Sequence, residues 1–140
     1  MSVAKGVFIY LLILRWMNRI VNLIKGAENI KLLFVCSKNK WRSLTAEKIF
    51  NGVNGYDVRS AGTEDKARVK ITGGHIGWAD LIFVMEKKHV RRLQERFKDS
   101  LSHKKIICLN IPDDYQFMDS ELIELLISSV SEHIELPMMI

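Results

Sequence analysis

The amino-acid sequence predicts an α/β fold: a single domain with a four-stranded parallel sheet and helices on both faces. Two observations lead to this prediction. Short apolar runs alternate with segments of helical periodicity across residues 30–135, and strands that alternate with helices form a parallel sheet covered on both sides. A chain of 140 residues is also long enough for one domain with its own core.

Most of the strands are predicted from short apolar runs bounded by turn or loop residues. We predict strands at residues 31–36, 56–61, 79–85 and 105–109. The second of these strands follows the turn residues Gly52 and Gly55.

The helices are predicted from apolar residues that recur every three or four positions. We predict helices at residues 43–53, within 66–77, at 86–98 and at 119–134. In the first helix Ala46, Ile49 and Phe50 share one face, and in the last helix Leu122 and Leu126 do so.

The loop between the first strand and the first helix carries the run Val35-Cys36-Ser37-Lys38-Asn39-Lys40-Trp41-Arg42-Ser43. Unpaired backbone N–H groups and the helix dipole attract anions at this place, and the same field favours the thiolate form of a cysteine. An arginine adds a planar pair of donors that matches two phosphoryl oxygens. This order of residues indicates a nucleophile aimed at a bound oxyanion, although the local pattern alone also fits a buried structural cysteine.

A second candidate group lies after the last predicted strand, in an acidic loop that contains Asp113, Asp114 and Asp119. Parallel strands end at the same edge of a sheet, so we expect this loop and Cys36 to share that edge. The residues by themselves also fit solvated turn and helix-cap carboxylates.

Taken together, these segments resemble the low-molecular-weight protein tyrosine phosphatase family over most of residues 31–130. Cys36, Arg42 and Ser43 match the family's Cys-x5-Arg-Ser signature, with Asn39 at the position of the family's loop asparagine. Further matches follow in the same order: Ser60-Ala61-Gly62-Thr63, then Ala79-Asp80-Leu81-Ile82, and then Ile111-Pro112-Asp113-Asp114-Tyr115, which resembles the loop that carries the general acid.

The resemblance implies a phosphatase-I-like fold and hydrolysis of phosphate monoesters of the protein tyrosine phosphatase kind, on a phosphorylated protein or a small phosphomonoester. It implies that Cys36 is the nucleophile, that Arg42 holds the phosphoryl oxygens and that Asp113 is the general acid. The implied substrate-binding residues are Ser37, Lys38, Asn39, Lys40, Trp41, Ser43 and Tyr115. Ser43 would hydrogen-bond the thiolate, Asn39 would hold the loop, and Tyr115 would form an aromatic wall. We expect neither a metal nor a cofactor, because Arg42 and backbone dipoles supply the positive charge.

Three departures from the family pattern bear on the substrate. Lys38 replaces the usual loop glycine, and a lysine there is strained if the position needs a positive φ. Trp41 replaces a second cysteine found in many members, which removes the usual disulfide partner of the nucleophile. Only residues 63–67 link the Ser-Ala-Gly-Thr segment to the next helix, where the family has a longer wall loop. We therefore expect a shallow, open site and leave specificity for phosphotyrosine open.

Two other functions stay open. Arsenate reductases share this fold but need further cysteines near the nucleophile, and the other cysteine, Cys108, is expected to be a small core residue. A non-catalytic phosphate- or phosphotyrosine-binding module is favoured by Lys38 and the short wall, and opposed by the intact Cys36, Arg42 and Asp113.

The formal net charge of +5 does not indicate nucleic-acid binding. Residues 1–26 contain four basic residues and no acidic one, which leaves 5 − 4 = +1 for the rest. The arginines at 91–96 have acidic neighbours on a predicted helix, which is typical of a solvated face. Two distant cysteines indicate neither a disulfide scaffold nor a zinc site. A reactive thiolate needs a reducing compartment, so we expect a cytoplasmic protein.

Residues 1–29 form an apolar and basic extension before the predicted domain at 30–135. An unbroken apolar run covers residues 7–14, and Arg15 and Arg19 interrupt the apolar residues after it, so the run is too short for a standard membrane-spanning helix. Three interpretations stay open: a helix at a membrane surface, a helix that packs on the domain or on a partner, and a natural chain start at Met17.

Overall fold

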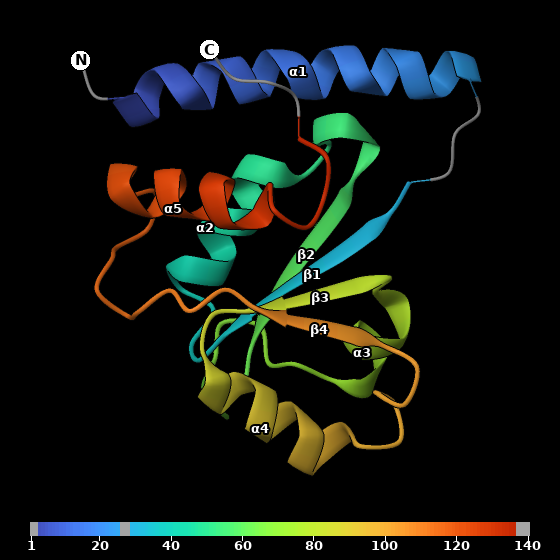
Figure 1. Cartoon of the computed structure of the whole chain (residues 1–140), viewed down its shortest axis with the longest axis vertical. Coiled ribbons are helices and arrows are strands. Elements are labelled where there is room, and N and C mark those ends of the chain that lie inside the picture. Colours follow the sequence, from blue (N-terminus) through green and yellow to red (C-terminus); the bar gives the residue numbers. More distant parts are fainter. Residues whose placement is uncertain (1–2, 26–28, 137–140) are drawn as a thin grey trace.

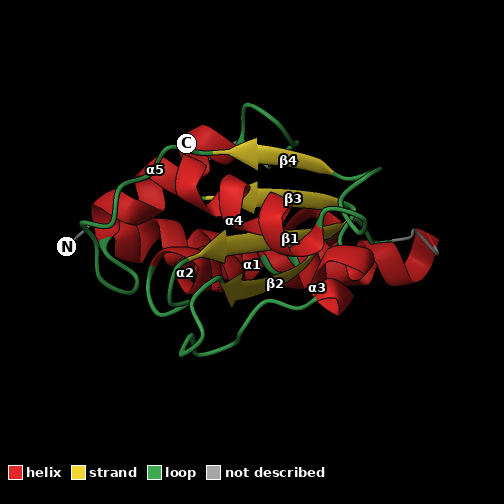
Figure 2. Ribbon diagram, turned by 90° about the horizontal axis from the view of Figure 1, so that it is seen from below, coloured by secondary structure: helices red, strands yellow, loops and turns green. Residues whose placement is uncertain are grey.

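The computed structural model describes residues 3–25 and 29–136 and confirms the α/β fold with a four-stranded parallel sheet. The strands are β1 (Lys31–Cys36), β2 (Asp57–Gly62), β3 (Leu81–Val84) and β4 (Lys105–Cys108). The strand order is β2-β1-β3-β4, and every neighbouring pair is parallel. Figure 2 shows all four strands pointing the same way, so their C-terminal ends meet at one edge of the sheet.

The helices cover both faces of this sheet. They are α1 (Val3–Lys25), α2 (Arg42–Phe50), the 3-10 helix η1 (Val53–Gly55), α3 (Gly73–Trp78), α4 (Lys87–Phe97) and α5 (Ser120–Val130). Helices α2 and α5 lie on one face, α3 and α4 lie on the other, and α1 crosses the outside of α2 and α5 (Figure 1). The expected helical cover on both faces is therefore confirmed.

Two helix boundaries differ from the sequence prediction. The helix predicted at residues 43–53 ends at Phe50, because Gly52 takes a left-handed φ of 82° and separates it from η1. The helix predicted at 119–134 already ends at Val130, where Ser131 is the C-cap. The remaining elements agree with the prediction to within a few residues at each end, apart from α3, which occupies only the end of the segment predicted to contain it.

The core is split by the sheet into two clusters. Along β1, Leu32, Phe34 and Cys36 face the α2–α5 side, whereas Leu33 and Val35 face the α3–α4 side. All four apolar residues before Cys36 are fully buried, which explains the unbroken apolar run of a central parallel strand. The ring of Phe34 stacks on those of Phe50 and Phe83, so β1 is held firmly behind the loop that follows it.

Helix α1 packs on the α2–α5 side through one of its faces. Leu11 is 1% exposed and belongs to that core cluster, and Val7 and Phe8 pack against it. The side chain of Arg15 donates to the carbonyl of Lys48 near the end of α2 and lies against Gly52. These contacts agree with the interpretation of the extension as a helix that packs on the domain. Within the described residues, no helix is both long and apolar enough to cross a membrane.

Candidate active site

The loop between β1 and α2 surrounds the sulfur of Cys36. The backbone N–H of Asn39 donates to Cys36 Sγ at 3.3 Å, and Ser43 Oγ lies 2.9 Å from the same sulfur. Asn39 Nδ2 donates to Ser43 Oγ at 2.8 Å, which leaves the hydroxyl proton of Ser43 free to point at the sulfur. These two donors stabilise negative charge on Cys36.

The sequence suggested backbone strain at Lys38, but the structure shows no strain there. The residue with positive φ in this loop is Asn39, at 56°, and Lys38 is not among the described residues of this kind. Asparagine tolerates the left-handed conformation better than other non-glycine residues. Lys38 therefore keeps ordinary backbone geometry, and its exposed side chain is free to add positive charge at the cavity.

The N-terminus of α2 is open toward the same loop. No side chain hydrogen-bonds across the N-cap position at Trp41, and the first turn contains no acidic residue. The first N–H groups of the helix therefore stay available for an anion, and the helix dipole favours one. The loop and the helix thus form an anion-binding cradle around Cys36.

The Ser-Ala-Gly-Thr segment supports this loop from beneath. Backbone N–H groups of Thr63, Glu64 and Arg68 donate to the carbonyls of Cys36, Ser37 and Lys38, at 2.9–3.0 Å. Gly62 approaches the loop so closely that a Cβ there would lie 2.5 Å from the carbonyl oxygen of Ser37. Glycine is thus required at this position by space, and the matched motif has a physical role.

Arg42 brings three strand ends together. Its side chain is 2% exposed, and its Nη1 donates to the carbonyl of Ile111 at 2.8 Å and to the carboxylate of Glu86. Its Nε lies 3.6 Å from Asp113 Oδ1. Glu86 follows β3 and Asp113 follows β4. The acidic loop and Cys36 therefore share one sheet edge, as predicted, and Arg42 lies between them.

Two residues of this network, Glu86 and His89, were not predicted as site residues from the sequence. His89 is fully buried, its Nδ1 accepts the backbone N–H of Glu86 at 3.0 Å, and its Nε2 lies 2.9 Å from Ser37 Oγ. Because Nδ1 accepts, the ring proton is on Nε2 and is donated to Ser37. The strand-end rule that selected Asp113 also applies to Glu86, and His89 lies one helical turn later.

Burial and charge set the protonation of this pair. Burial, followed by the positive charge of Arg42, lowers the pKa of His89 from 6.5 to about 4, so the ring is neutral at pH 7. Burial would raise the pKa of Glu86, but the hydrogen bond and charge of Arg42 outweigh it and hold that pKa below its usual range. Glu86 is thus the anionic partner that keeps the buried guanidinium in place.

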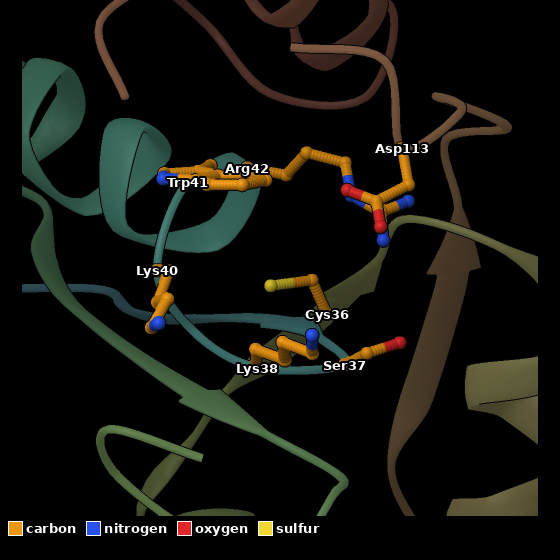
Figure 3. A pocket seen from close by; sticks show the side chains of 7 residues that line it. All are labelled: Cys36, Ser37, Lys38, Lys40, Trp41, Arg42 and Asp113. Carbon is orange, nitrogen blue, oxygen red and sulfur yellow. The ribbon is translucent and has the colours of Figure 1, made fainter. Parts of the chain in front are cut away.

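A cavity of about 70 Å³ opens in front of Cys36. Its lining consists of Cys36, Ser37, Lys38, Lys40, Trp41, Arg42 and Asp113. Figure 3 shows the thiol in the middle of this group, with Asp113 beside the end of the Arg42 side chain. The volume is far below the roughly 300–1,000 Å³ of sites that enclose drug-sized ligands. It suits one small group, with the rest of a substrate outside.

The three other predicted site residues lie outside the cavity lining. Asn39 and Ser43 are fully buried behind Cys36 and act on its sulfur. Tyr115 is partly buried and packs against the α2–α5 core cluster, and burial, together with the charges of Glu121 and Asp114, raises its pKa. The aromatic side chain that lines the cavity is Trp41, which is 42% exposed.

Cys108 and Cys36 face opposite sides of the sheet. Cys108 pairs in register with Val84 and packs against the α3–α4 cluster, whereas Cys36 belongs to the α2–α5 cluster. Cys108 Sγ donates to its near neighbour Asn110 at 3.3 Å. A disulfide between the two thiols would therefore require rearrangement of the sheet.

No protein-family model matches the sequence, and no curated protein does so either. Solved structures do match. The YwlE arginine phosphatase from Geobacillus stearothermophilus matches with a TM-score of 0.60 and 22% identity, over 74% of this chain and 91% of that one. The tyrosine phosphatase Wzb from Escherichia coli K30 matches with a TM-score of 0.60 and 17% identity, over 74% of this chain and 95% of that one. A low-molecular-weight protein tyrosine phosphatase from T. tengcongensis matches with a TM-score of 0.60 and 21% identity, over 76% of this chain and 100% of that one.

The chain has the low-molecular-weight protein tyrosine phosphatase fold. The resemblance seen in the sequence is thereby confirmed at the level of the fold. The matched proteins include both tyrosine and arginine phosphatases, so the fold does not choose between these substrates.

Proposed function

We propose that this protein is a cysteine-dependent phosphomonoesterase that acts as a protein tyrosine phosphatase. One observation carries the proposal: in a single small cavity, the hydrogen-bonded sulfur of Cys36 faces Arg42 and Asp113. A stabilised nucleophile, a cation for the oxyanion and a group that transfers protons are what phosphoryl transfer through a covalent intermediate requires.

In the first step, the Cys36 thiolate attacks phosphorus in line with the ester oxygen. The S–P bond forms as the P–O bond breaks, and Asp113 gives its proton to the leaving oxygen. Nη1 of Arg42 is already held by Glu86 and Ile111. We assign its Nε and Nη2, together with loop N–H groups, to the non-bridging oxygens.

In the second step, Asp113 accepts a proton from water as the water oxygen attacks phosphorus. The S–P bond breaks, inorganic phosphate leaves, and Cys36 returns as a thiolate that is stabilised by the Asn39 N–H and the Ser43 hydroxyl. The proton that Asp113 gives in the first step is thus recovered by Asp113 in the second.

Features of the cavity rim favour phosphotyrosine over phosphoarginine. Trp41 is exposed there and offers an aromatic face to a phenyl ring. Lys38 and Lys40 also line the cavity and are exposed, so they attract a dianionic aryl phosphate and disfavour a group that carries a guanidinium.

The proposal is tested by steady-state hydrolysis of p-nitrophenyl phosphate by the wild type and by Cys36→Ser. We expect turnover by the wild type and none above background by the variant, because the hydroxyl of Ser is a far weaker nucleophile than a thiolate. Quenched wild-type reactions should contain phosphate bound to Cys36, which mass spectrometry detects.

Two other outcomes would assign a different function. A folded wild type that binds phosphate without turnover would be a binding module, although the regular geometry of Lys38 removes one argument for it. Arsenate-dependent formation of a disulfide between Cys36 and Cys108 would indicate an arsenate reductase. Paired assays on phosphotyrosine and phosphoarginine peptides of the same sequence then decide the substrate, and faster turnover of phosphoarginine would overturn our assignment.

A further inference from the structure

Helix α1 has a second apolar face that the domain does not cover. Leu11 defines the packed face, and Val7 and Phe8 lie beside it. The exposed apolar residues of α1 are Ile9, Leu12, Ile13, Trp16, Met17 and Ile20, each between 39% and 66% exposed. At 100° per residue, Ile13 and Ile20 lie on the side of the helix opposite Leu11.

This face is a continuous stripe of large side chains. Successive members are three, one, three, one and three positions apart, which is the spacing of neighbours along one side of a helix. Soluble proteins seldom leave such a contiguous apolar surface open, and a stripe of this kind marks an interaction site. Trp16, at 66%, is the most exposed large hydrophobic residue among those whose side chains are described.

The charge of the same segment identifies its partner. Residues 1–26 carry Lys5, Arg15, Arg19 and Lys25 and no acidic residue, although the remainder of the chain is nearly neutral. A partner that takes apolar side chains and prefers positive charge is a bilayer surface with anionic headgroups. Indole rings such as that of Trp16 are favoured at the boundary between headgroups and acyl chains.

The matched phosphatase structures align with only part of this chain. They are covered over 91–100% of their own length by 74–76% of this chain, so about a quarter of this chain is additional to the shared fold.

We propose that the exposed face of α1 binds the surface of membranes that contain anionic lipids, with the helix axis parallel to the surface. Its apolar side chains enter the boundary between headgroups and acyl chains, and the net positive charge of the segment favours anionic headgroups. Helices α2 and α5 lie between α1 and the sheet with its loop between β1 and α2 (Figure 1). A protein that is bound to a membrane through α1 therefore keeps its cavity open to solvent. The lipid interaction does not depend on the proposed phosphatase activity.

The test is co-sedimentation of the full chain with vesicles of phosphatidylcholine, with and without phosphatidylglycerol. The wild type is expected to sediment with the anionic vesicles, less with the neutral ones, and less again at high salt because the attraction is screened. The variant Ile13→Ser/Trp16→Ser is expected to bind at least about tenfold more weakly, since it removes two of the inserted side chains.

A matched control is Phe117→Ser, which removes an apolar side chain of similar exposure (44%) outside α1 and is expected to bind like the wild type. Thermal unfolding and p-nitrophenyl phosphate turnover without vesicles should be the same for both variants and the wild type. If Ile13→Ser/Trp16→Ser unfolds, the variant Ile9→Ser/Ile20→Ser, which alters the same face, is tested in its place.

Wild type that stays in solution with anionic vesicles overturns the proposal, as does an α1 variant that binds these vesicles as well as the wild type does. A wild-type dimer that these substitutions convert to a monomer would assign the face to a second copy of the chain.

Discussion

The two loops that form the cavity are built in opposite ways. In the nucleophile loop, residues 36–43, Cys36, Asn39 and Arg42 are at most 3% exposed. Hydrogen bonds hold the sulfur of Cys36, the side-chain nitrogen of Asn39 and Nη1 of Arg42. The loop after β4 holds Asp113 with its side chain 54% exposed, and the interaction described for that carboxylate is the ion pair to Arg42 at 3.6 Å.

Strand order explains this contrast. β1 is a central strand, so the loop after it is flanked by the segments that follow β2 and β3, and both contribute contacts. β4 is an edge strand, so the loop after it has neighbours on one side only. The proposed nucleophile and oxyanion site are thus organised before substrate binds, whereas the proposed acid is left free to follow the leaving group.

The largest effect on turnover is expected in the exposed loop. Asp113→Asn should lower kcat for phenyl phosphate by about 10²–10⁴, because the leaving phenolate then departs without a proton. The loss should be smaller for p-nitrophenyl phosphate, whose leaving group needs less help. The melting temperature should be nearly unchanged, since the side chain is largely solvated. Asp114→Asn is the matched control, and equal losses in both variants would exclude a specific role for Asp113.

In the buried loop, Arg42→Lys should cost both activity and stability. Lysine keeps the charge but loses the planar fork, so kcat should fall by roughly 10²–10³, the cost of one lost oxyanion donor. Glu86 and the carbonyl of Ile111 would lose a well-placed partner, so urea denaturation should also show lower stability. The control Arg91→Lys changes an exposed arginine of α4. Unchanged stability in Arg42→Lys would contradict the view that the loop is organised by these contacts.

Gly62→Ala tests the support beneath the nucleophile loop. The new Cβ would lie 2.5 Å from the carbonyl oxygen of Ser37, and backbone cannot yield as a side chain does. We expect a loss of about 1–3 kcal/mol in the free energy of unfolding, as for other overpacked sites, and lower turnover. Gly77→Ala is the control, because nothing lies within 4 Å of a Cβ at that position. If turnover of Gly62→Ala equals that of Gly77→Ala, the loop is less rigid than its contacts imply.

The last prediction concerns the pH dependence of stability through His89, where no change in turnover at neutral pH is involved. The pKa is about 4 in the folded protein against an ordinary value of 6.5, so the unfolded chain binds more protons between these values. Stability should therefore fall as the pH is lowered from 6.5 to 4, by up to about 3 kcal/mol.

Urea denaturation across this pH range measures the effect. His89→Gln should show a flatter dependence than the wild type, while His103→Gln, which changes an exposed histidine, should follow the wild type. Identical slopes for the wild type and His89→Gln would show that this ring does not titrate as its burial implies.

The order of motifs along the chain predicted that Cys36 and the acidic loop share one sheet edge, and the family resemblance selected Asp113 within that loop. Cys36 and Asp113 each follow an apolar run, and the C-terminal ends of parallel strands share an edge, so a local pattern and one topological rule place both. The same reasoning could not identify which residues would support them. The strand-end rule places Glu86 at the same edge, but nothing in the local sequence shows that Glu86 lies against Arg42 or that His89 lies against Ser37.

The sequence by itself determined the alternation of strands and helices and the meeting of Cys36 with the acidic loop, because these depend on order along the chain. The family resemblance added the proposed roles of Cys36, Arg42 and Asp113. Only the tertiary structure decided how they are held. The pairs Arg42–Glu86 and Ser37–His89 join residues 44 and 52 positions apart, and they form because β3 is placed beside β1 in the sheet. The two faces of α1 were decided in the same way, since an evenly apolar helix acquires a buried side and an open side only when it packs on one surface.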